Sequence, residues 1–110
     1  MENEIIKKIS GEDRGFKFNV KTFEIFSEIT SVEFGDMGTH FINKPFKSIL
    51  AMVMAGNEVY SKGNGADEYV VADWIDELTD EAFQEIWNCF EVNLTKYLTK
   101  MTRPEDKKKS

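Results

Sequence analysis

The chain has little cysteine and histidine, and each scarcity excludes a class of protein. The single cysteine, Cys89, cannot form an intramolecular disulfide and gives no indication of an oxidising compartment. The single histidine, His40, leaves no spacing typical of a zinc site. A catalytic Cys–His pair is not indicated either, because His40 lies in a predicted loop and Cys89 lies off the main apolar stripe of its helix, which favours a packed, inert thiol. We therefore expect a protein that is not an enzyme, with no catalytic, metal-binding or cofactor-binding residues and no cofactor.

Long apolar runs are also missing. The longest, ILAMVMAG at residues 49–56, is far shorter than the roughly 20 residues that span a bilayer. The opening MENEIIKKIS has no apolar segment of the length found in signal peptides. These patterns predict a cytoplasmic protein without a membrane partner.

Positive charge is absent from one part of the chain. The formal net charge is −6, and residues 67–85 hold eight acidic residues and no basic one. Nucleic-acid binding needs clustered basic residues that neutralise phosphates. Only the region from Lys96 onward is basic, with six basic residues against two acidic ones. Nucleic acid is therefore not an expected partner.

Hydrophobic residues are abundant enough for a core. They make up 41% of the 110 residues and include nine phenylalanines, which suits one domain with a buried interior. The patterns below predict a mostly all-α fold, a small single-domain bundle of about four helices with a short extended N-terminal segment. The predicted domains are a mobile lead-in at 1–15, a helical domain at 16–101 and a basic flexible tail at 102–110.

The first ordered elements are an extended segment and a helix. Phe16 and Phe18 alternate with polar residues, which indicates an extended segment too brief to build a sheet. Asn19 is a good N-cap for a helix over 20–30. A loop is predicted for 31–44, with inward-facing anchors at Phe34, Met37 and Phe41.

The remaining helices have recognisable starts. Pro45 opens a strongly apolar helix, which should be the most buried element and which Gly56 should end in the left-handed conformation. Residues 57–68 are predicted to form a loop with a mobile tip at GNG. A short helix starts near Asp67, and Thr79 caps a long last helix that ends near Arg103-Pro104.

The acidic stretch DWIDELTDEAFQEIW, residues 73–87, has two interpretations. It is either the solvated side of two helices or a docking face for a basic partner. Solvated helix faces usually mix signs because like charges one turn apart repel, and this stretch contains no lysine. The candidate partner-binding residues are Asp73, Trp74, Asp76, Glu77, Asp80, Glu81 and Trp87.

The last helix carries a second ambiguous pattern. Its apolar residues alternate by four and three, the rhythm of a coiled coil, over fewer than three heptads. The pattern indicates core packing or a self-association seam, so a homo-oligomer stays possible. The residues are Phe83, Trp87, Phe90, Leu94, Tyr97 and Met101.

Three segments resemble the tail assembly chaperones of long-tailed bacteriophages. They are FKFNVKTFEIFSEITSVEF, the helix ending AMVMAG, and VVADWIDELTDEAFQEIWNCF, and the resemblance covers about residues 16–100. It implies a small helical protein of the host cytoplasm, absent from the finished virion. Such a protein binds the tape measure protein and helps tail tube protein subunits polymerise around it. The family offers no defined site to carry over.

Two other functions fit the sequence. A small acidic inhibitor, or nucleic-acid mimic, would use its carboxylates in place of phosphates and bind basic enzymes in a salt-sensitive way. An oligomeric structural or adaptor protein would use the last helix as its seam.

Overall fold

A β-hairpin opens the computed structural model, which describes residues 3–101. Strands β1 (Glu4–Ile9) and β2 (Glu12–Lys17) pair antiparallel, with Glu4 opposite Lys17 and Ile9 opposite Glu12. Ser10 and Gly11 form the connection with φ of 54° and 79°. A two-residue hairpin turn that matches the twist of its strands requires a positive φ at both central residues.

The hairpin corrects two predictions. Residues 4–15, expected as a lead-in without secondary structure, form β1 and most of β2, and the segment at Phe16 is part of a sheet because β1 supplies its partner strand. The less exposed residues recur with period two along β1, at Ile5, Lys7 and Ile9, and Ile9 is buried. This period was hidden because Lys7 takes the middle position and Ile6, which is also apolar, is exposed. Residues 1–2 lie outside the described part of the chain.

Helix α1 (Val20–Thr30) has the predicted bounds. The Asn19 side chain accepts hydrogen bonds from the Lys21 and Thr22 N–H groups, and the Thr22 hydroxyl accepts one from the Asn19 N–H. This reciprocal capping satisfies donors that the first turn leaves unpaired. Ser31, with φ of 58°, ends the helix.

The predicted loop over 31–44 is wrong in part, because it contains the 3₁₀ helix η1 (Phe34–Asp36) and helix α2 (Met37–Asn43). A seven-residue helix with a glycine is weak in isolation and depends on tertiary packing. The three predicted anchors supply that packing. Met37 is buried, and Phe34 and Phe41 are partly buried against the core, which confirms their inward orientation.

Helix α3 (Pro45–Tyr60) is central and longer than predicted. It begins at Pro45 as expected, contacts β2, α1, α2 and α4, and does not end at Gly56. A Cβ atom at Gly56 would lie 2.8 Å from the Phe18 ring, so this glycine lets the aromatic segment after β2 approach the helix. Lys62 and Gly63, both with positive φ, follow the helix end.

The loop before the next helix is held by α3. The Glu58 side chain accepts from the Gly65 N–H at 3.0 Å, and the Asn57 side chain accepts from the Ala66 N–H at 2.9 Å. Residues 57–60 belong to α3, so the predicted loop starts later than expected.

Helices α4 (Glu68–Glu77) and α5 (Asp80–Met101) start as predicted. Asp67 accepts from the Val70 N–H, and the Thr79 hydroxyl accepts from the Ala82 N–H. The predicted helix end at Arg103-Pro104 and the predicted tail at 102–110 lie outside the described residues.

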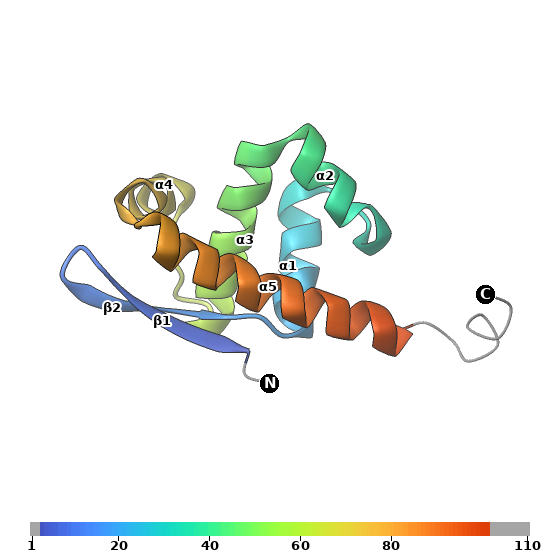
Figure 1. Ribbon diagram of the computed structural model, residues 1–110, viewed down its shortest axis with the longest axis horizontal. Coiled ribbons are helices and arrows are strands. Elements are labelled where there is room, and N and C mark those ends of the chain that lie inside the picture. The colour runs from blue at the N-terminus through green and yellow to red at the C-terminus, as the bar shows by residue number, and fades with distance from the viewer. Residues whose placement is uncertain (1–2, 102–110) are drawn as a thin grey trace, which may run out of the picture.

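Helix α5 crosses the molecule and completes the core (Figure 1). The Phe90 ring lies 5.3–5.8 Å, between centroids, from five other rings. They belong to Phe18, Phe23, Phe26, Phe41 and Trp87. Core packing is therefore confirmed for this part of the apolar stripe. Residues 3–101 form one mostly α-helical domain with five α-helices, where about four were predicted.

Candidate functional site

The structure separates the predicted partner-binding residues into outward acids and inward tryptophans. Trp74 is only 5% exposed, with its ring 6.2 Å from that of Phe16 and the Arg14 guanidinium 4.9 Å from its centre. Trp87 is partly buried, with its ring 5.0 Å from that of Phe41. The carboxylates are exposed, namely those of Asp73, Asp76, Glu77, Asp80 and Glu81. These acids stay predicted binding residues, whereas both tryptophans already serve the core.

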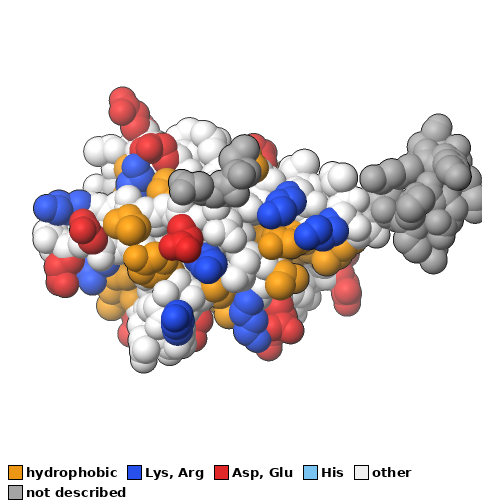
Figure 2. All heavy atoms as spheres, turned by 90° about the horizontal axis from the view of Figure 1, so that it is seen from below, with side chains coloured by type: hydrophobic (Ala, Val, Ile, Leu, Met, Phe, Trp, Pro, Cys, Tyr) orange, Lys and Arg blue, Asp and Glu red, His pale blue; other side chains and the backbone are white. Residues whose placement is uncertain are grey.

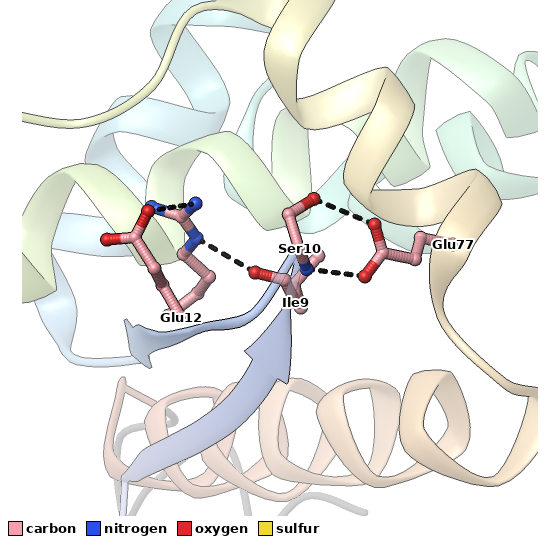
Figure 3. A network of polar contacts seen from close by, with 5 residues as sticks. Ile9, Ser10, Glu12 and Glu77 are labelled. Atoms are coloured by element: carbon pink, nitrogen blue, oxygen red, sulfur yellow. Dashed lines mark hydrogen bonds and ion pairs between the residues drawn. The ribbon is translucent and has the colours of Figure 1, made fainter.

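Glu77 is engaged within the chain. Its carboxylate accepts hydrogen bonds from the Ser10 backbone N–H and, at 2.7 Å, from the Ser10 hydroxyl (Figure 3). These two bonds, the backbone one first, lower the pKa of Glu77. The end of α4 thereby holds the hairpin turn in place.

The hairpin also supplies a counter-charge to α5. Lys7 of β1 forms an ion pair with Glu85. Part of the missing positive charge in the acidic stretch therefore comes from a segment far away in sequence. This weakens the inference that the stretch lacks lysine because a partner neutralises it.

A different surface has the form of a binding site. A groove of about 330 Å³ lies between α1, the η1–α2 segment and the end of α5. Its apolar lining comes from three parts of the chain. The residues are Val20, Phe23, Phe34, Met37, Tyr97 and Met101.

Aromatic contacts and one turn shape this groove. The Phe23 ring lies edge-on to Phe34 at 6.3 Å and to Tyr97 at 5.6 Å. The Ser27 hydroxyl donates to the Val32 carbonyl oxygen at 2.5 Å. That bond turns the chain after α1, so that η1 folds back beside the helix and places Phe34 against Phe23.

The charged residues that line the groove are all acidic. Glu24, Glu28 and Glu33 line it on the side of α1 and η1. On α5, the ammonium groups of Lys96 and Lys100 lie 5.6 Å and 5.7 Å from the centre of the Tyr97 ring. Toward the end of α5, Figure 2 shows hydrophobic side chains beside basic ones.

One rim acid is paired. Glu24 bonds Lys21 at 2.5 Å, and this hydrogen bond with its ionic attraction raises the pKa of Lys21. Glu28 and Glu33 are exposed at the groove and add negative charge to its margin. A cation held near an apolar surface would therefore be attracted to this side.

The groove offers apolar side chains and carboxylates for binding. Its lining contains no histidine or cysteine, and no group of three or more possible metal ligands comes together among residues 3–101. His40 instead contacts Ser48, whose hydroxyl donates to the Lys44 carbonyl oxygen. No helix within the described range has both the length and the apolarity to cross a bilayer.

Sequence reasoning missed most of the groove because its residues are distant along the chain. It did identify Phe34 and Met37 as inward anchors. The spacing of Glu24 and Glu28 by four residues on the polar side of α1 was a usable signal, since such residues are neighbours on a helix.

Comparisons with known proteins give no neighbour for this chain. No model of a protein family matches it, and no curated protein or solved structure is similar to it. The resemblance to tail assembly chaperones consequently rests on the three sequence segments alone.

Proposed function

We propose that the chain is a non-catalytic assembly chaperone of the phage tail type. In this proposal it binds the tape measure protein and assists tail tube assembly in the host cytoplasm. The sequence resemblance supplies the client, and one observation supports a binding role: the apolar groove with an acidic wall between α1 and α5.

A helical client fits the groove best. An amphipathic helix places residues i, i+3, i+4 and i+7 on one side, and this stripe lies down in an apolar groove. Lysine or arginine beside the stripe would face Glu28 and Glu33, which favours one orientation and speeds association. Covering such a stripe keeps a long helical client from aggregating before the tail tube surrounds it.

The size of the groove predicts reversible binding. Its volume of about 330 Å³ accommodates a few side chains. Ligand pockets span roughly 300–1,000 Å³, so this one is at the small end. A single groove would hold one or two helical turns weakly, and a long client would need many copies of the chaperone. Weak individual contacts also allow the client to be released during assembly.

Co-expression and pull-down test the proposal. The chain is co-expressed with a tape measure protein or with a tail tube protein and recovered at low and at high salt. We expect the tape measure protein to be retained, with the double variant Glu28→Lys/Glu33→Lys binding much less. The matched control, Asp73→Lys/Asp76→Lys, makes the same charge change on α4 and should bind normally.

Two results would contradict the proposal. One is the absence of binding to either protein at any salt concentration. The other is equal retention by the groove variant and the wild type in samples shown by circular dichroism to be folded.

The nucleic-acid mimic is the second candidate function. It is favoured by the exposure of Asp73, Asp76, Asp80 and Glu81 on α4 and the start of α5. If that function holds, basic nucleic-acid enzymes bind the chain, the affinity collapses at high salt, and the α4 double variant loses binding while the groove variant keeps it.

A further inference from the structure

The corner between α2 and α3 exposes two large apolar side chains. Ile42 is 80% exposed and Phe46 is 82% exposed, more than any other large hydrophobic residue described. Two exposed lysines lie near them in sequence. Lys44 lies between Ile42 and Phe46, and Lys47 directly follows Phe46. Neither apolar side chain contributes to the core, so folding alone does not account for this arrangement.

A second apolar hollow lies next to this corner. It has a volume of about 370 Å³, and Ile49 belongs to its lining. Ile49 follows Phe46 by three residues on α3, so both side chains lie on one side of the helix. The other lining residues come from α4, the turn after it and the start of α5. They are Ile75, Leu78, Asp80, Phe83 and Gln84.

We propose that this side of the molecule is an interface between two copies of the chain. Phe46 of each copy enters the hollow of the other, between Ile49, Leu78 and Phe83. A two-fold axis makes both contacts at once, because protrusion and hollow lie side by side on the same surface.

Charge complementarity supports a second copy as the occupant. The protrusion carries Lys47 directly after Phe46, and the hollow is lined by Asp80 and by no basic residue. In the two-fold arrangement Lys47 of one copy approaches Asp80 of the other, and the reverse contact forms as well. This pairing needs no partner protein and is independent of the groove between α1 and α5.

The expected dimer is weak. A phenylalanine side chain buries about 150–250 Å², and a smaller contribution from Ile42 adds to it. The total falls well short of the roughly 800 Å² that each partner buries in a stable complex. Self-association should therefore rise gradually with concentration.

Sedimentation equilibrium from micromolar to millimolar concentration tests this inference. The average mass should rise from 12.7 kDa toward twice that value. Phe46→Ser should weaken association by about tenfold or more, as loss of a buried aromatic anchor does. The matched control is Tyr69→Ser, which removes another highly exposed aromatic ring, at the start of α4, and should associate like the wild type.

A charge exchange distinguishes contact between copies from an effect on folding. Lys47→Glu and Asp80→Lys should each weaken association, because like charges then meet in both contacts. An equimolar mixture of the two variants should regain it, since every pair in the mixed dimer is again opposite. Glu81→Lys makes the same charge change in the first turn of α5 and so controls for the loss of a negative charge near the positive end of the helix dipole. A wild type that is monomeric throughout, or a mixture that associates no better than its components, would overturn the inference.

Discussion

Asn57 joins the hairpin, α3 and the loop before α4, so its replacement by alanine tests how these parts are held together. The side chain is 7% exposed. Its Nδ2 donates to the Gly15 carbonyl oxygen at 3.0 Å, and its Oδ1 accepts from the Ala66 N–H at 2.9 Å. Alanine removes both bonds and leaves two backbone groups to find other partners.

The loss of stability can be worked out from these two bonds. Each net hydrogen bond contributes about 0.5–1.5 kcal/mol, and a buried group left unpaired costs about 1–3 kcal/mol. The cost here falls at the low end because Gly15, Asn57 and Ala66 line a partly polar hollow that water can enter. Helix propensity returns a few tenths of a kcal/mol to the alanine variant. We therefore expect a decrease of about 2 kcal/mol in the free energy of unfolding.

Urea unfolding followed by tryptophan fluorescence measures this change. The matched control is Asn88→Ala on the exposed side of α5, where the amide oxygen accepts only from Gln84 in the described contacts. That substitution should change stability by less than about 0.5 kcal/mol. If Asn57→Ala is as stable as Asn88→Ala, Asn57 does not hold the junction as described.

Asn57→Asp adds a pH dependence that separates hydrogen bonding from packing. An ionised carboxylate cannot donate to the Gly15 carbonyl oxygen, whereas a protonated carboxyl group can. We expect burial and repulsion from the Gly15 carbonyl oxygen to outweigh the Ala66 N–H bond, so that folding raises the pKa of the new carboxyl group and stability is lost as the pH rises through the folded pKa. Relative to Asn57→Ala, the aspartate variant should lose stability between acidic and neutral pH, and equal urea midpoints at both would contradict this.

Three further changes probe other contacts. Glu77→Ala should lower the melting temperature at neutral pH, and the difference from the wild type should vanish in acid. A carboxylate whose pKa is lowered by folding stabilises the fold at pH values above its ordinary pKa of 4.5. That stabilisation is lost as the pH falls through the pKa of the folded state. Gly56→Ala should lower the urea midpoint. Overpacking against the buried Phe18 ring costs about 1–3 kcal/mol, which exceeds the gain of about 1 kcal/mol in helix propensity. A higher midpoint would contradict this. Phe90→Ala should cost about 3–5 kcal/mol in urea unfolding, because its ring fills the centre of the aromatic core, and a loss below 1 kcal/mol would show that the core does not depend on it.

The starts of α1, α4 and α5 could be predicted because their signals are local. Asn19, Asp67 and Thr79 each cap a helix through hydrogen bonds to N–H groups within three residues. The hairpin and the role of Gly56 could not, because they depend on segments that are distant in sequence. The glycine at 56 faces an aromatic ring of another element, and no pattern around it distinguishes that from a helix end.

The candidate binding surface was predictable only as a charge pattern. Composition identified the exposed acids, but Trp74 and Trp87 were named with them as candidate partner-binding residues, because a short window does not reveal how far a helix side is covered by the core. The groove combines Val20 with Tyr97, and only the packing of α1 against α5 brings them together. In the sequence, the apolar residues of the groove lie far apart and share no pattern.

Chemical-shift mapping tests the central claim most directly. A helical segment of the tape measure protein, with an apolar stripe flanked by lysine or arginine, is titrated into the isotope-labelled chain at moderate salt. We expect shift changes centred on Val20, Phe34 and Tyr97, and their loss in Glu28→Lys/Glu33→Lys. Changes confined to residues 73–81, or no changes up to millimolar peptide, would contradict it.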